Sequence, residues 1–269
     1  MIRLPSAASM AVTIAGLTSG APGAAVVLNE YNAVSSTNWL GATTQIGATD
    51  EDTFFGRIQG NGGNWIELVV VSDHVDMRGW KLQWEEILAG KAGTIFLSTN
   101  AFWADMRAGT ILTFTESTSA QGGYNTDTTF DPCDGDWWIN VNTFDTTYVS
   151  STTTNVVGHG TGNFSVGDDD WRVTILTSTN QVIYGPAGEG ALQYPGSNVV
   201  NQQICRLEAN PTASTTPASP YNDGKYSTFG SPNSWKDPIT TCRLYQNFTV
   251  LRQALASACH ICAPIVLNE

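Results

Sequence analysis

The chain has little charge, and positive charge is the scarcer kind. Its 269 residues include 12 Lys and Arg against 24 Asp and Glu, which gives a formal net charge of −12 at neutral pH. Proteins usually neutralise phosphate backbones with Lys and Arg, so binding to free nucleic acid is disfavoured. The low charged fraction of 13% suits an all-β extracellular protein rather than a helical cytosolic one.

Histidine and recognisable catalytic motifs are also scarce. The three histidines are His74, His159 and His260, and none lies in a nucleophile motif or a zinc-protease pair. The acidic residues are numerous enough to form a glycosidase pair in space, but no pair stands out from the others. We therefore expect a protein that is not an enzyme, with a secreted hydrolase as an alternative.

No segment has the roughly 20 consecutive apolar residues that a membrane-spanning helix needs. The start of the chain instead combines the basic Arg3, an apolar run from Leu4 to Leu17 and small residues up to Ala25. This order is typical of a secretory signal peptide. We expect a signal over residues 1–25, no membrane span, and a secreted or cell-surface protein.

The number of cysteines is odd. In an oxidising compartment four of the five could pair and one would remain, and spacing alone does not fix the connectivity. The disulfide candidates are Cys133, Cys205, Cys242, Cys259 and Cys262. The last two are separated by only two residues, but no second pair follows to complete a zinc site. An ordinary disulfide or free thiols in the tail are the simpler interpretations.

Short β-branched and aromatic runs, separated by Gly, Asn and Asp, predict many β-strands. Residues 64–71 are apolar on both faces, as in the middle of a sandwich, whereas Trp80, Leu82 and Trp84 alternate with polar residues. Two helical stretches are expected, at 100–107 and 249–258. This pattern favours a β-sandwich. The other predicted strands are 111–115, 137–141, 171–176, 181–185 and 203–207.

Several motifs follow one another in a recognisable order. The chain reads V-L-N-E-Y-N at 27–32, N-W-I-E-L at 64–68 and M-R-G-W-K-L at 77–82, and later R-L-E at 206–208 and S-T-F-G-S-P-N at 227–233. This order resembles the lamin-tail family, whose domains are immunoglobulin-like β-sandwiches.

The resemblance implies a domain organisation and a class of function. The lamin-tail-like sandwich would cover residues 26–236, with an extended insertion at about 85–170 and a C-terminal tail at 237–269. Bacterial members resemble accessory modules of secreted and surface proteins, and the fold itself has no catalytic residues. We therefore expect a non-catalytic binding or surface-structure module whose partner is an extracellular protein or polysaccharide.

One acidic residue lies where burial is expected. Glu67 stands between Ile66 and Leu68 in a predicted core strand, which is a costly place for an unpaired carboxylate. We predict that its side chain meets a backbone donor or an arginine, so that its role is structural rather than catalytic.

An acidic loop and two tryptophans are the candidate ligand residues. Asp127, Asp131, Asp134 and Asp136 lie close together, and calcium prefers several oxygen ligands from one flexible loop. The spacing differs from the helix-loop-helix calcium motif, and Asp also forms ordinary turns. Trp137 and Trp138 follow directly and should point to opposite faces of a strand, so that one ring could stack on a sugar.

The chain ends on I-V-L-N-E, at Ile265 to Glu269, and begins its first predicted strand with V-V-L-N-E, at Val26 to Glu30. The repeat could be the first strand of a second copy of the domain. It could also pair with the sheet of a neighbouring molecule, which would make the protein a self-associating extracellular structural protein. Chance similarity is the third interpretation.

Overall fold

The computed structural model describes residues 23–116, 125–154 and 164–253. The regular secondary structure of the described chain is mostly β-sheet, as the sequence predicts. The predicted signal is largely outside the described residues, and so are Cys259, Cys262 and the repeated strand at Ile265 to Glu269. The strands are β1 (Val26–Asn32), β2 (Trp65–Val70), β3 (Lys81–Glu86), β4 (Lys91–Leu97), β5 (Ile111–Thr115), β6 (Trp138–Asn142), β7 (Val149–Thr154), β8 (Trp171–Leu176), β9 (Val182–Ala187), β10 (Ile204–Leu207), β11 (Tyr221–Gly224), β12 (Ser234–Lys236) and β13 (Arg243–Tyr245).

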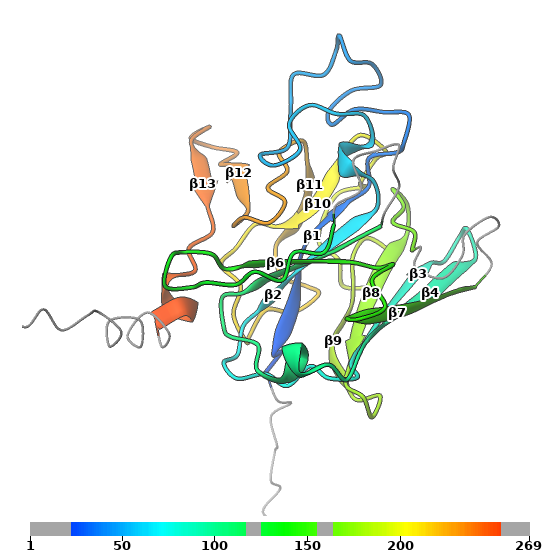
Figure 1. Ribbon diagram of the computed structural model, residues 1–269. Coiled ribbons are helices and arrows are strands. Elements are labelled where there is room, and N and C mark those ends of the chain that lie inside the picture. Colours follow the sequence, from blue (N-terminus) through cyan, green and yellow to red (C-terminus); the bar gives the residue numbers. More distant parts are fainter. Residues whose placement is uncertain (1–22, 117–124, 155–163, 254–269) are drawn as a thin grey trace, which may run out of the picture.

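The first sheet has six strands in the order β11-β10-β1-β2-β5-β6 (Figure 1). Every residue of β1, β2 and β5 is buried, which matches the prediction of a central strand with apolar residues on both faces. β5 and β6 run parallel, whereas the other neighbours are antiparallel. Buried acids and amides also lie on these strands, so this sheet carries the polar network described below.

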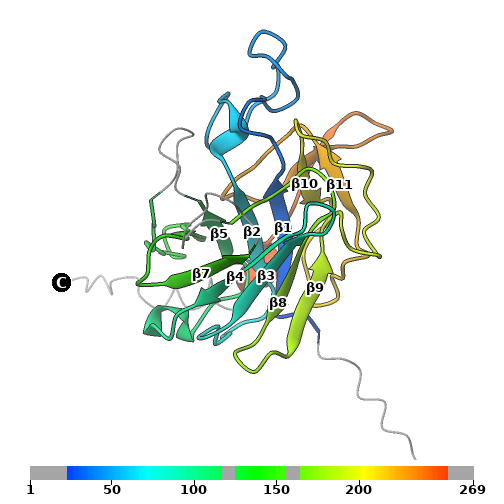
Figure 2. The same ribbon diagram turned by 90° about the vertical axis from the view of Figure 1, so that its right-hand side faces the viewer.

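The second sheet has five antiparallel strands in the order β7-β4-β3-β8-β9. In β3 the buried residues Leu82 and Trp84 alternate with Lys81 and Gln83, which confirms the predicted half-buried pattern. Figure 2 shows this sheet lying across β1 and β2. Side chains of both sheets form one apolar core, in which the rings of Tyr31 and Trp171 lie 4.5 Å apart. The two sheets therefore form a β-sandwich.

The expected insertion at about 85–170 is part of both sheets. Its strands β4 and β7 lie in the second sheet, and β5 and β6 lie in the first. β5 pairs with β2 on one side and with β6 on the other, so removal of the insertion would take two strands from one end of the first sheet. The predicted helix at 100–107 is the single 3-10 turn η2 (Ala101–Ala104), and η1 (Gly60–Gly62) is a second such turn.

A separate hairpin of β12 and β13 lies beside the sandwich (Figure 1). Lys236 pairs with Arg243 across it, so the expected boundary between residues 236 and 237 falls inside one hairpin. A helix starts at 249, as the sequence predicts, and is described up to 253. Across the residues that the structure describes, no helix is long and apolar enough to cross a membrane.

Candidate functional site

Glu67 of β2 is fully buried inside a polar network. The Nδ2 of Asn29 donates to its Oε1 at 2.7 Å, and the backbone N–H of Gly230 donates to its Oε2 at 2.8 Å. The prediction of a backbone donor for this carboxylate is therefore confirmed. Burial, and next the nearby Glu30 carboxylate, raise the pKa of Glu67 well above its usual value. The surroundings of Glu67 therefore favour its protonated form more than water does.

Glu30 of β1 is the second buried acid of the network. Its carboxylate accepts from the Oγ1 of Thr228 at 3.0 Å and from the N–H of the same residue at 3.3 Å. Burial, followed by the charge of Asp52, raises the pKa of Glu30 to about 8. Arg206 lies opposite Glu30 across the sheet and opposes this rise. Its guanidinium, however, donates to Glu208 at 2.6 Å.

Amide side chains complete the network around the two acids. The Nδ2 of Asn233 donates to the backbone oxygens of Asn29 at 3.0 Å and Leu207 at 3.1 Å. The Nε2 of Gln246 donates to the Oδ1 of Asn29 at 2.8 Å and to the same Leu207 oxygen at 3.1 Å. The network thus ties β1 and β10 to the hairpin segment. The only sequence signal for Asn233 was its place at the end of the 227–233 motif.

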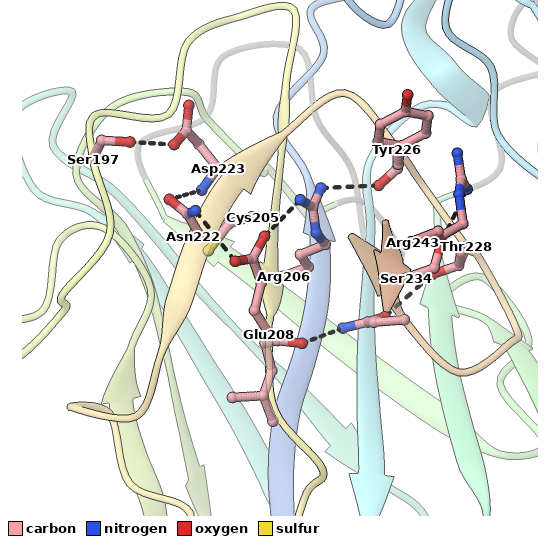
Figure 3. Close-up of polar contacts among 12 residues, drawn as sticks. Ser197, Cys205, Arg206, Glu208, Asn222, Asp223, Tyr226, Thr228, Ser234 and Arg243 are labelled. Atoms are coloured by element: carbon pink, nitrogen blue, oxygen red, sulfur yellow. Dashed lines mark hydrogen bonds and ion pairs between the residues drawn. The ribbon is translucent and has the colours of Figure 1, made fainter. Parts of the chain in front are cut away.

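The network continues to the surface of β10 and β11, as Figure 3 shows. Arg206 donates to the backbone oxygen of Tyr226 at 3.2 Å, and Asn222 donates to Glu208 at 3.3 Å. On the hairpin, Arg243 donates to the Oγ of Ser234 at 3.2 Å. These contacts hold the hairpin and β11 in place.

Trp137 and Trp138 point to opposite sides, in agreement with the alternation of a strand. Trp137 is 8% exposed, and the guanidinium of Arg252 lies 4.8 Å from its ring centre. Trp138 is half-buried, and its Nε1 donates to the Oγ1 of Thr113 at 2.9 Å. Its ring packs against Phe54 and Phe229, with ring centres at 5.3 and 5.5 Å. Both tryptophans therefore support other side chains.

Three of the four aspartates of the acidic loop, Asp127, Asp131 and Asp136, cap turns with their side chains. Asp127 accepts from the N–H and Oγ1 of Thr129, and Asp131 accepts from the N–H groups of residues 133 and 134. Asp136 accepts from the N–H of Trp138, and the N–H of Asp134 itself is bonded to the Asp131 carbonyl. Within residues 23–116, 125–154 and 164–253, no three His, Cys, Asp or Glu residues form a metal-binding group. Calcium stays a prediction.

Three cysteines fall within the described chain, and they differ in state. Cys133 is disulfide-bonded. Cys205 and Cys242 carry free thiols. The prediction that these two residues could form disulfides is therefore corrected. Cys205 is buried in β10 beside the hydroxyl of Tyr194 at 2.8 Å, and burial raises its pKa to about 12. Cys242 is exposed directly before β13, which leaves its thiol open to solvent.

An open hollow with aromatic walls lies between the loop at 49–56 and the hairpin. Its volume is about 520 Å³, and we call it the aromatic hollow. Phe54 is 42% exposed there, and its buried side rests on Trp138 and Phe229. Tyr226 also lines this hollow, and the guanidinium of Arg243 lies over its ring, 4.2 Å from the ring centre. The lining residues are Thr49, Asp50, Glu51, Asp52, Thr53, Phe54, Phe55, Gly56, Tyr226 and Arg243.

Comparisons with known proteins identify no relative of this chain. No protein-family model matches the chain, and no curated protein or solved structure is significantly similar to it. The lamin-tail resemblance therefore rests on the motifs alone. In the structure, its first three motifs fall on or next to the adjoining strands β1 and β2 and on the start of β3.

Proposed function

We propose that this protein is a secreted, non-catalytic binding module of the lamin-tail type that binds an extracellular polysaccharide in the aromatic hollow. The observation that carries the proposal is the half-exposed ring of Phe54, held from behind by aromatic side chains. A ring fixed in this way offers a flat apolar surface at little cost in side-chain entropy.

The polar residues of the aromatic hollow suit a ligand rich in hydroxyl groups. Asp50 and Glu51 supply acceptors on the loop side, and Arg243 and the Tyr226 wall supply donors and a second ring on the hairpin side. Sites for small ligands typically combine an apolar surface with a few well-placed polar groups. Trp138, one of the two tryptophans expected to offer a stacking ring, acts here through Phe54, because it forms the support beneath that ring.

The placement of the acids supports a role without catalysis. Three acids have pKa values raised mainly by burial, Glu30, Glu67 and Glu189, and the first two lie inside the sandwich bonded to neighbouring groups. Raised carboxyl pKa values often mark active sites, but structural networks produce them as well. The bonds to Thr228 and Gly230 account for these two residues as parts of the fold.

Retention on insoluble polysaccharides tests the proposal. Cellulose, chitin and xylan beads would be incubated with the protein and with Phe54→Ala, and the bound fraction measured against bead concentration. We expect one of the three to retain the protein, and Phe54→Ala to weaken retention about tenfold, as the loss of one aromatic contact implies.

Phe144→Ala is the matched control, because Phe144 is 44% exposed and lies outside the aromatic hollow. It should bind like the parent. Thermal unfolding of all three proteins shows whether Phe54→Ala keeps the fold. If no bead retains the parent, or if both variants lose retention equally, the polysaccharide proposal is wrong.

A further inference from the structure

The outer edge of β13 carries main-chain groups that point away from the hairpin. Asp237 N–H bonds to the oxygen of Cys242, and Gln246 N–H bonds to the oxygen of Asn233. Hydrogen-bonded pairs alternate along an antiparallel ladder, so Leu244 also faces β12. The N–H and C=O groups of Arg243 and Tyr245 therefore point outward. All three residues of β13 are exposed, which makes this an open edge strand.

This edge forms one wall of a wide hollow of about 790 Å³, which we call the basic groove. Its lining contains two arginines and no Asp or Glu, although the whole chain has a net charge of −12. The lining residues are Pro232, Arg243, Leu244, Tyr245, Gln246, Asn247, Phe248, Thr249, Arg252 and Gln253. The charge of the groove is thus opposite to that of the protein as a whole.

The two arginines are held in place without carboxylate partners. Arg243 stacks on Tyr226, and Arg252 donates to the backbone oxygen of Gly109 at 3.0 and 3.1 Å. Neither takes part in an ion pair with the described residues, whereas the arginines at 78, 107, 172 and 206 do. A fixed guanidinium without a counter-ion is ready to bind a carboxylate.

We propose that the β13 edge binds an extended acidic peptide by strand addition. The peptide backbone pairs with the outward groups of Arg243 and Tyr245, and its carboxylates meet Arg243 and Arg252. Tyr245, which is 65% exposed, offers an apolar surface to alternate side chains. The open main-chain edge favours a peptide over an anionic polysaccharide, because a polysaccharide has no matching ladder of N–H and C=O groups.

A pair of labelled peptides tests the backbone part of the proposal. The first alternates Glu with Val and Thr over nine residues and carries fluorescein, and fluorescence polarisation reports its binding to the full chain. The second has the same sequence with methyl groups on alternate backbone nitrogens, which removes donors and keeps the charge. We expect the first to bind and the second to bind at least tenfold more weakly.

Two matched pairs of protein variants test the residues. Arg243→Gln should weaken binding about fivefold, the effect of one partly exposed charge pair. Lys236→Gln should stay within twofold of the parent, because Lys236 pairs with Arg243 in the hairpin and contacts the same Tyr226 ring but does not line the groove. Tyr245→Pro, which removes an outward N–H, should weaken binding more than Tyr245→Ala.

Several results would overturn the proposal. Equal binding of the two peptides would exclude strand addition. Equal losses of peptide affinity in Arg243→Gln and Lys236→Gln would show that net charge, and not the position of Arg243, determines binding. Growth in sedimentation mass of the protein alone, abolished by Tyr245→Pro, would assign the edge to a second copy instead. Phe54→Ala should keep full peptide binding, so failure of the polysaccharide proposal does not affect this one. If Tyr245→Pro does not fold, the methylated peptide still tests whether binding depends on backbone hydrogen bonds.

Discussion

The buried acids Glu30 and Glu67 predict that the protein becomes less stable as the pH rises from about 5 to about 8. In the unfolded chain Glu30 ionises near its ordinary pKa of 4.5, whereas in the fold its pKa is about 8. Between these two values the folded state binds more protons than the unfolded state. The Glu30 contribution to the free energy of unfolding therefore falls with rising pH in that window and is constant on either side.

The size of the effect follows from the same two values. A rise from 4.5 to about 8 corresponds to on the order of 5 kcal/mol for Glu30 alone. Glu67 acts in the same direction, because burial also raises its pKa. A loss of this size is large against the 5 to 15 kcal/mol that roughly spans the stability of folded proteins. Acids with lowered pKa values, such as Asp73, act only below about pH 4.

Urea unfolding at pH 5, 6, 7 and 8 measures the slope, and Glu30→Gln removes the Glu30 contribution. The amide has the shape of the protonated acid and does not ionise. The free energy of unfolding of the variant should therefore fall less steeply with pH than that of the parent, and the stability of the variant relative to the parent should increase as the pH rises. Glu189, whose pKa is raised to about 7, is present in both proteins and cancels in the comparison. Glu51→Gln, in the exposed loop, is the control and should keep the parent slope. A parent whose stability is flat or rises from pH 5 to pH 8 would refute the reasoning.

Three further predictions concern packing, hydrogen bonds and thiols. Gly230→Ala should destabilise by about 1 to 3 kcal/mol in urea unfolding, because a Cβ would lie 2.7 Å from the Trp138 ring at a φ of +72°; an unchanged midpoint would contradict this. Asn233→Ala should cost about 2 to 4 kcal/mol in the same assay, since it removes buried hydrogen bonds to the Asn29 and Leu207 carbonyls, the second of which keeps its bond from Gln246. In thiol labelling, Cys242→Ser should remove a fast phase of the native protein, whereas Cys205→Ser should remove a thiol that reacts only in urea.

Strands rich in β-branched and aromatic residues could be predicted from the sequence. The predictions at 111–115 and 171–176 agree with β5 and β8 at both ends. β4 was missed because it opens with Lys, Ala and Gly, and β7 because it is mostly Ser and Thr. Both are held by pairing with their neighbours in the second sheet, and a local pattern does not contain that information.

The candidate site could be predicted from the sequence only where the immediate neighbours of a residue limit the environment of its side chain. Glu67 between two apolar neighbours required a partner, but that the partner is Gly230, 163 residues away, depends on the closed fold. The alternation of Trp137 and Trp138 gave their opposite directions but not the side chains that cover them. Phe54 was missed because no periodic pattern surrounds it, since it belongs to a loop whose shape is set by hydrogen bonds to Asp52.

The bond between Asn29 and Gln246 joins positions 217 residues apart. During synthesis at about 5 to 20 residues per second, β1 leaves the ribosome roughly 10 to 40 seconds before the side chain that completes its polar contacts. Over that interval β1 and β2 can pair and Asn29 can bond to Glu67, but the groups that later bond to Gly230, Asn233 and Gln246 have only water as a partner. The polar network therefore acts as a late closing step, and we expect nascent chains ending before position 246 to remain open to chaperones and proteases.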